Sequence, residues 1–197
     1  MPPQTLTAPA GRLGTSRHWW GEHGWADIRL WVSGLASLVR DLGARVGLTG
    51  ADDERPLVEA ILAHVKPWTR ARITTAAGSL AFPAFCALIE AANVVVTNNT
   101  GPMHMAAALD TPVVALFALT NPPEQWGPWR VPHRMLWHEV PCRLCYSRVC
   151  PTTHDCLREV HPRDVVQAAA DLLAESGQHL VGDNQSVLES LLTGSRR

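Results

Sequence analysis

Hydrophobic positions in the first half of the chain change repeatedly between helical and strand-like spacing. Apolar residues recur every three or four positions over residues 28–42, and Gly43 ends what we predict to be an amphipathic helix. Residues 44–50 (ARVGLTG) predict a short buried strand. A second helical pattern covers residues 57–65 and ends before Pro67. Helix, strand and helix therefore follow one another through short connections.

The same alternation continues to residue 117. Residues 94–97 (VVVT) form a continuous β-branched run, which is typical of a strand buried on both faces. Around this run we predict a strand at 71–75, a helix at 79–92 with Pro83 in its first turn, a helix at 103–110 and a strand at 112–117. Strands and helices that alternate in this order form a parallel sheet. We therefore predict an α/β fold, a Rossmann-like parallel sheet with helices on both faces.

The remaining segments have weaker patterns. Residues 121–134 form a Pro- and Trp-rich loop before a short strand at 134–138, and a last helix is predicted at 161–174. The tail has four apolar residues at the spacing of a short helix: Val187, Leu188, Leu191 and Leu192. Residues 1–16 show no periodicity. We divide the chain into a disordered head (1–16), one folded domain (17–175) and a tail (176–197).

Composition restricts the classes of function. The chain has 197 residues, a formal net charge of −1 and 46% hydrophobic residues, which suits one globular domain and is too small for most two-domain enzymes. The low net charge gives no overall field to hold a nucleic-acid backbone, so we expect no nucleic-acid partner. No apolar run reaches the ~18 to 20 residues of a membrane span, and the first residues lack a secretory signal. We therefore expect a cytoplasmic protein without a transmembrane segment.

The connection after the strand at 94–97 has the chemistry of an anion site. Asn99 or Thr100 can cap the following helix, Gly101 allows close approach of the backbone, and Pro102 suits the first helical turn. The free amides and the dipole at the start of a helix attract phosphate without a cluster of cations. The alternative is that NNTGP is simply a good strand-to-helix connection.

Four of the five cysteines gather in residues 140–156. They follow the spacing C-x2-C-x4-C-x5-C and are Cys142, Cys145, Cys150 and Cys156. Four thiolates at this spacing are compatible with a structural Zn²⁺ ion or an iron–sulfur cluster. Two disulfides or four free thiols are the alternatives, and disulfides are disfavoured in a reducing compartment.

Three segments together resemble a known family. The runs VVVTNNTGPMHMAAALDTPVVALF, NPPEQWGPW and PCRLCYSRVCPTTHDCLREV, in this order, are similar to the carboxy-terminal half of glycosyltransferase family 9, the ADP-heptose:lipopolysaccharide heptosyltransferases. LASLVRDLGARVGLTGADDER also resembles a helix, strand and turn of that family. The resemblance implies a GT-B architecture, in which a first Rossmann-like domain holds the acceptor and the catalytic base. Residues 17–175 resemble the second domain, which binds the nucleotide sugar.

The resemblance also implies which residues bind the donor. Thr100 and Gly101 match the family's diphosphate-binding turn, which Pro102, Met103 and His104 complete, and Asn99 stands where the family usually has Asp. Glu54 matches a position that could hydrogen-bond the ribose, with a helix-start carboxylate as the alternative. Arg17 corresponds to a basic residue that contacts donor phosphate. His104 could donate to phosphate or pack between helix and loop.

The reaction implied is inverting transfer of heptose from an ADP-sugar to a lipopolysaccharide core acceptor, with no cofactor required. No carboxylate of this chain can be assigned as the base, so we expect the chain to be the donor-binding half and inactive alone. The alternatives are a nonenzymatic nucleotide-sugar binding remnant and a metal-binding interaction domain. The full enzyme could associate peripherally with the membrane. Trp126 and Trp129 could stack on the donor, but burial against the cysteine segment is favoured.

Overall fold

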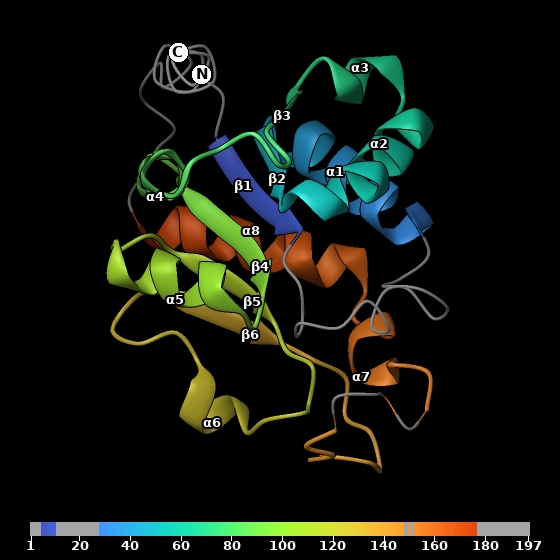
Figure 1. The fold of residues 1–197 in the computed structure, drawn as a ribbon, viewed down its shortest axis with the longest axis vertical. Helices are drawn as coiled ribbons and strands as arrows, with labels where there is room; N and C mark the ends of the chain where they lie inside the picture. The colour runs from blue at the N-terminus through green and yellow to red at the C-terminus, as the bar shows by residue number, and fades with distance from the viewer. Residues whose placement is uncertain (1–4, 11–27, 148–149, 151, 177–197) are drawn as a thin grey trace.

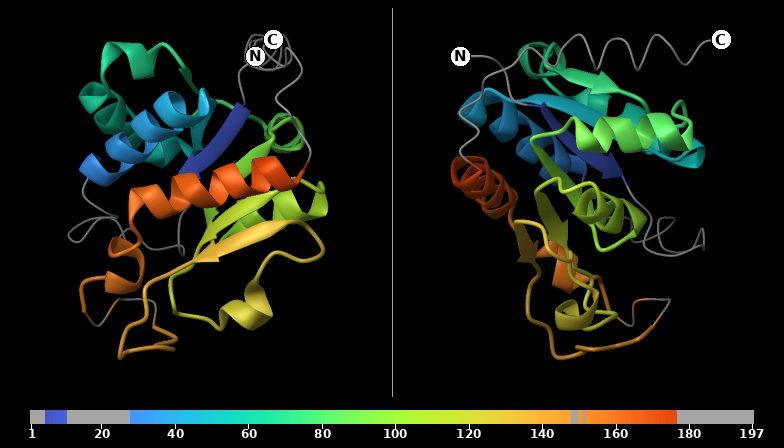
Figure 2. Two further views of the ribbon diagram at one scale, coloured as in Figure 1. Left: turned by 180° about the vertical axis from the view of Figure 1, so that it is seen from behind. Right: turned by 90° about the vertical axis from the view of Figure 1, so that its left-hand side faces the viewer.

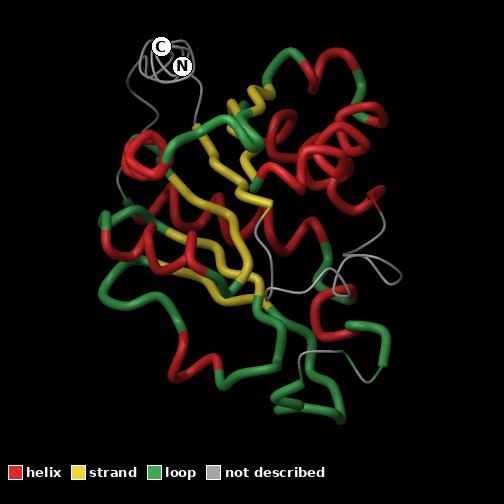
Figure 3. The backbone as a smooth tube through the Cα atoms, in the orientation of Figure 1, coloured by secondary structure: helices red, strands yellow, loops and turns green. Residues whose placement is uncertain are grey.

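The computed structural model describes residues 5–10, 28–147, 150 and 152–176, and its centre is a parallel β-sheet (Figures 1 and 3). The sheet has six strands in the order β3-β2-β1-β4-β5-β6, and every neighbouring pair is parallel. The strands are β1 (Thr5–Ala10), β2 (Arg45–Gly50), β3 (Ile73–Thr75), β4 (Val94–Asn98), β5 (Val113–Leu116) and β6 (His133–Leu136). This order is that of a doubly wound Rossmann-like sheet.

Helices cover both faces of the sheet (Figure 2). One face carries α1 (Ile28–Leu42), α2 (Arg55–His64) and α8 (Pro162–Glu175), and the other carries α4 (Phe82–Glu90) and α5 (Gly101–Ala108). Shorter helices are η2 (Asp52–Glu54), α3 (Pro67–Arg70), α6 (Pro123–Trp126) and α7 (Asp155–Arg158). The predicted fold class is confirmed. None of the helices in the described ranges is long and apolar enough to cross a bilayer.

Strand β4 separates two hydrophobic clusters. Its Val94 and Val96 pack in a cluster with α1, α2 and α8, whereas Val95 packs in a second cluster with α4 and α5. All five residues of β4 are buried. Successive side chains of a strand point to opposite faces, and both faces of this strand are covered. This is why the segment has an uninterrupted apolar sequence instead of an alternating one.

The prediction of a disordered head is wrong for residues 5–10, which form strand β1. Thr5 to Ala10 pair with β2 from Thr5↔Arg45 to Ala10↔Gly50, and Leu6 and Thr7 also pair with β4. The segment TLTAPA has one large apolar residue and a proline, so local preference argues against a central strand. Hydrogen bonding to a neighbour on each side overrides that preference. The rest of the predicted head, residues 1–4 and 11–16, lies outside the described residues.

The other predicted elements differ mainly in their ends. Helix α1 has the predicted bounds, the helix predicted at 79–92 is shorter as α4, and α6 forms within the predicted loop at 121–134. The last predicted helix is present as α8. The helix predicted within the tail falls in residues 177–197, outside the described part of the chain.

Truncation of Leu172 tests the packing of α8. Its side chain is 0% exposed in the cluster shared with α1 and the sheet, so Leu172→Ala removes buried contacts and leaves a cavity. We expect the free energy of unfolding in urea to fall by about 2 to 5 kcal/mol. Arg163→Ala on the same helix, with a side chain 79% exposed, is the matched control and should change it little. Equal effects of the two substitutions would contradict this packing.

Candidate functional site

The candidate site lies where the strand order reverses. The carboxyl ends of all six parallel strands lie at one edge, and the helices that follow β1 and β4 in the described chain, α1 and α5, lie on opposite faces of the sheet (Figures 1 and 2). This switch point is the usual ligand position in such folds. The connection from β4 to α5, residues 99 and 100, lies at this point.

Asn99 fastens this connection to the end of β5. Its backbone amide donates to the Leu116 carbonyl at 3.0 Å, and its side-chain Oδ1 accepts from the Ala118 amide at 3.2 Å. Thr100 is the N-cap residue of α5, but no side chain makes a capping hydrogen bond there. Thr100 thus occupies the predicted N-cap position, but the predicted capping hydrogen bond from a side chain is absent. The Asn99 carboxamide instead holds two strand ends together.

The start of α5 leaves polar groups available. The Met103 amide donates to the Thr100 carbonyl at 3.0 Å, and Pro102 has no amide hydrogen. Among the described residues, the amide of Gly101 has no hydrogen-bond acceptor, and Gly101 and His104 are both exposed. The Thr100 Oγ1 is buried, also without a partner in that part of the chain. A free amide and a hydroxyl group at the start of a helix can together bind an anion.

Met103 anchors the first turn of α5 and offers no free group to the site, because its amide is bonded to the Thr100 carbonyl. Its side chain is 0% exposed and packs in the cluster between α5 and the sheet. His104, one residue further, is exposed at the first turn of the helix. The prediction of packing between helix and loop does not describe this histidine, and its ring is accessible to a ligand.

Glu54 follows β2 at the same edge. Its side chain is 7% exposed, and Oε2 accepts a hydrogen bond from the Ala51 amide at 2.7 Å. This contact closes the turn before α2, which is the helix-start role given above as the alternative. The neighbouring Asp52 pairs with Arg55 at 2.6 Å. Arg17, the remaining candidate for phosphate contact, lies outside the described residues.

Gly78 places the loop after β3 against the turn that carries Glu54. Its amide donates to the Gly50 carbonyl at 2.9 Å, and its φ of +66° is in the left-handed region. A Cβ atom at this position would lie 2.6 Å from Asp52 Oδ1 and 2.7 Å from Asp52 Cα. Glycine is therefore required by both the backbone conformation and the close approach.

The four clustered cysteines line one cavity at the carboxyl end of the sheet. Residues 118–120, Val140, Thr152, His154 and Asp155 complete its wall. All five cysteines of the chain are free thiols, which removes the disulfide alternative for this structure. Burial raises the pKa of the Cys156 thiol, the Leu119 amide lowers it through a hydrogen bond, and the charges of the other three clustered cysteines raise it. The thiols therefore disfavour one another's ionisation.

The geometry of this cavity does not form a ready metal site. Within residues 28–147, 150 and 152–176, no group of three or more His, Cys, Asp or Glu side chains is arranged to hold a metal ion. Cys150 Sγ instead accepts a hydrogen bond from the His154 amide at 3.2 Å and lies 3.6 Å from Thr152 Oγ1. The chemistry of four thiols suits a metal, but their positions here do not.

Arg143 joins the cysteine segment to α6, and sequence reasoning missed it. Its guanidinium donates to Glu139 Oε1 at 2.7 Å and to Glu124 Oε1 at 2.9 Å, and it lies 6.0 Å from the ring centre of Trp137. The Trp137 indole donates to the same Glu139 oxygen at 2.8 Å. The sequence around Arg143 does not indicate that its partners are Glu139 and Glu124, which lie 4 and 19 positions before it.

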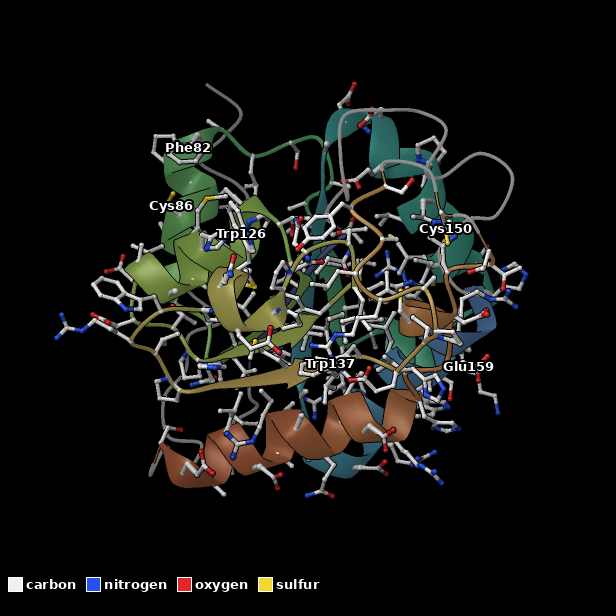
Figure 4. The ribbon with its side chains drawn as sticks, turned by 90° about the horizontal axis from the view of Figure 1, so that it is seen from below. Phe82, Cys86, Trp126, Trp137, Cys150 and Glu159 are labelled. Carbon is white, nitrogen blue, oxygen red and sulfur yellow. The ribbon has the colours of Figure 1, made fainter. Side chains whose placement is uncertain are left out.

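The tryptophans of the following loop are not buried. Trp126 is 51% exposed and Trp129 is 75% exposed, with the Arg130 guanidinium 5.3 Å from the Trp129 ring centre. The favoured prediction, burial against the cysteine segment, is therefore wrong. Figure 4 labels Trp126 on α6, on the side of α4 and away from Cys150. The contact with the cysteine segment is made by Glu124 instead.

Comparison with known proteins decides the family. The sequence model of glycosyltransferase family 9 (heptosyltransferase) matches residues 19–155, which is more than half of the chain. The chain belongs to glycosyltransferase family 9. The lipopolysaccharide heptosyltransferase 2 of Salmonella typhimurium is 28% identical over 174 residues, which cover 86% of this chain and 46% of the relative. This chain thus spans about half the length of that family member.

Solved structures agree in fold. The Escherichia coli ADP-heptose lipopolysaccharide heptosyltransferase II superposes with a TM-score of 0.69 at 24% identity, over 89% of this chain and 48% of that one. The dodecameric iron-containing heptosyltransferase TibC, solved with ADP-D-beta-D-heptose, gives a TM-score of 0.60 at 17% identity, over 92% and 48% of the two chains. Coverage of about half is the share expected of one of the two domains in a GT-B architecture.

Acidification tests the contacts of Glu139 with Trp137 and Arg143. Hydrogen bonds from Trp137 and Arg143, with the charge of Arg143, lower the pKa of Glu139 below its ordinary 4.5. A lowered pKa in the folded state means that this contact stabilises above the ordinary pKa and is lost as the pH falls through the lowered value. We expect the Trp137 indole N–H signal in NMR to shift on that acid limb.

Glu139→Gln is the control for this titration. The amide cannot ionise, so the acid-dependent shift of the Trp137 signal should disappear in that variant. A titration unchanged by the substitution would contradict the assignment of the shift to Glu139.

Proposed function

We propose that this chain is the donor-binding half of an inverting glycosyltransferase that transfers heptose from an ADP-sugar to a lipopolysaccharide core acceptor. Family membership supports the reaction class, and the relatives named above are heptosyltransferases. The observation that supports the donor role most directly is the start of α5, where the unpaired Gly101 amide and Thr100 hydroxyl group and the exposed His104 lie at the switch point of the sheet.

The chemistry of this site suits a diphosphate leaving group. In the reaction, the acceptor hydroxyl oxygen bonds to the anomeric carbon of the sugar while the bond from that carbon to the diphosphate oxygen breaks. Negative charge then accumulates on ADP. Preorganised amides and the positive end of the α5 dipole stabilise that charge without reorganisation. An imidazolium at His104 would add a donor, so the mechanism requires no divalent metal.

The proton of the acceptor hydroxyl must go to a base, and we propose that this base lies outside the described residues. Glu54 accepts from the Ala51 amide and Asp52 pairs with Arg55, so these two carboxylates at the edge have structural partners. The chain spans about half the length of the relatives named above, and the family resemblance places the base and acceptor in the other domain. A nucleotide-sugar donor is a cytoplasmic metabolite, so we propose a cytoplasmic location, with peripheral association with the membrane to reach a lipid-linked acceptor.

Titration calorimetry with ADP tests the donor site. We expect ADP to bind more tightly than AMP, because the second phosphate meets the amides at the start of α5. Thr100→Val keeps the side-chain shape and removes the hydroxyl group, and should weaken ADP binding about ten- to a hundredfold, the range of one hydrogen bond to a charged group. Thr74→Val, at an exposed position of β3, is the matched control. Equal affinities for ADP and AMP would exclude the diphosphate site.

A nonenzymatic nucleotide-sugar binding module is the second candidate. Asn99 stands where the family usually has Asp, and its carboxamide is occupied by the Ala118 amide. Heptose transfer distinguishes the two functions. The chain alone should transfer nothing, whereas a full-length protein that also binds acceptor but transfers nothing would favour the module.

We further propose that the cysteine cavity can take a structural metal, Zn²⁺ or an iron centre. Four buried or half-buried thiols that line one cavity supply the donor set, and TibC is described as iron-containing. Burial and, to a smaller extent, repulsion from the other three thiols raise the Cys156 pKa, and a bound cation would offset both effects. Because the described thiols are not positioned as ligands, the segment would have to close around the ion.

Metal analysis of protein purified under reducing conditions tests this site. We expect about one metal equivalent, or one cluster, per chain. Cys145→Ser should abolish it, whereas Cys86→Ser, which alters the one cysteine outside the cavity lining, should leave it unchanged. A content near zero in the unmodified chain would refute the metal and leave four free thiols.

A further inference from the structure

The two helices that cover one face of the sheet, α4 and α5, have almost no charged residues. Between Arg72 and Asp110, a stretch that the structure describes completely, Glu90 at the end of α4 is the only Asp, Glu, Lys or Arg. The helices on the other face, α1, α2 and α8, instead have exposed charged residues: Arg40, Asp41, Arg55, Glu59, Arg163 and Asp164. The two faces of the sheet therefore present different chemistry to the solvent.

Helix α4 is apolar around its whole circumference, although only one side of it is buried. Leu88 and Ile89 lie in the core. Phe82, in the first turn, is 67% exposed, and the other side chains outside the core include three half-buried ones: Phe85, Cys86 and Ala87. Figure 4 labels Phe82 and Cys86 on α4 at the periphery of the molecule, on the opposite side from Cys150. A helix that is hydrophobic on all sides is normally covered on all sides.

Helix α5 continues this apolar surface. It shares a hydrophobic cluster with α4, and both helices lie on the same face of the sheet (Figure 2). Outside the cluster core it has no Asp, Glu, Lys or Arg, and several of its apolar residues are half-buried or exposed: Met105, Ala107 and Ala108. We call the outer surface formed by these residues and by Phe82, Phe85, Cys86 and Ala87 the α4–α5 face.

The chemistry of the α4–α5 face suits a second copy of this chain. Two-fold pairing brings the same surface of both copies together, so a charged residue near the axis would meet a like charge. A face without charges avoids this repulsion. A negatively charged membrane surface, in contrast, attracts proteins through Lys and Arg, and residues 73–109 contain neither.

We propose that the α4–α5 face is the interface of a homodimer, with Phe82 among the side chains that it buries. Burial of Phe82 and its neighbours against the second copy would remove from water the apolar surface that the single chain exposes. This proposal goes beyond the proposed function and needs no bound nucleotide.

Sedimentation velocity of the full chain at micromolar concentrations tests the dimer. We expect a species of twice the mass of the chain. Phe82→Glu should weaken dimerisation by about a hundredfold or more, because each copy would bury an unpaired carboxylate. A carboxylate at the start of a helix is favourable, so the folded monomer should keep its circular dichroism spectrum. Trp68→Glu, at a 47% exposed aromatic on α3, is the matched control and should leave the association unchanged.

Cys86 supplies a second readout at the face itself. Its alkylation by iodoacetamide, followed by mass spectrometry of the peptide, should slow several-fold as the protein concentration rises and the dimer forms. In Phe82→Glu this dependence on concentration should disappear. Cys142, which lines the cysteine cavity, is the internal control and should react at a constant rate.

Four results would overturn the proposal. They are a monomer at every concentration, a dimer of equal strength in Phe82→Glu, equal weakening by Trp68→Glu, and an open series of larger oligomers in place of a closed dimer. Binding of a monomeric chain to phosphatidylcholine vesicles, lost in Phe82→Glu, would assign the face to a membrane and also overturn it.

Discussion

The backbone pairing of β1 with β2 on one side and β4 on the other joins the two halves of the sheet. Without it, β2 and β3 would form one small sheet and β4, β5 and β6 another. At this reversal of strand order, α1 and α5 pack on opposite faces of the sheet. In doubly wound sheets this position favours ligand binding, whichever side chains occupy it.

The candidate site combines topology with a small number of polar groups. Helix α5 begins directly beside the reversal, and its first turn holds Pro102 and a buried Met103, so the chain is rigid while Gly101 and His104 remain accessible. Asn99 and the segment 118–120 tie this turn to the cysteine segment. The turn at residues 99–101 and the cysteine cavity are thus two parts of one hydrogen-bonded edge, although Asn99 and Cys142 are 43 positions apart in the sequence.

Sequence patterns predicted those parts of the fold where local and tertiary preferences agree. The apolar repeat of α1 suits only a helix with one buried face, so the sequence predicted the bounds of this helix. The consecutive valines of β4 suit only a strand covered on both faces, so the sequence predicted the burial of this strand. Strand β1 did not, because TLTAPA contains Pro9 and is stabilised by neighbours distant in sequence. The turn at 99–101 was predicted as an anion site from its residue types. The bond from Ala118 to Asn99 was not, since it depends on how β4 and β5 align.

Side-chain environments were the least predictable. The exposure of Trp126 and Trp129 and the partners of Arg143 depend on the path of the loop between β5 and β6, for which the sequence has no periodic pattern. The spacing of the four cysteines predicted one local site, and the four thiols do line one cavity. Residues of one short segment cannot lie far apart in the fold. Spacing alone does not set the distances between sulfurs that distinguish a metal site from free thiols.

The contact at Gly78 has a consequence for variation within this half of the fold. Any larger residue there must push against Asp52, and through it against the turn in which Glu54 closes on Ala51. Such a replacement would deform the edge of the proposed donor site from the side of β3 without touching a ligand. Which residues position 78 accepts therefore depends on the distance between the loop after β3 and the turn after β2. It does not depend on the chemistry of the donor.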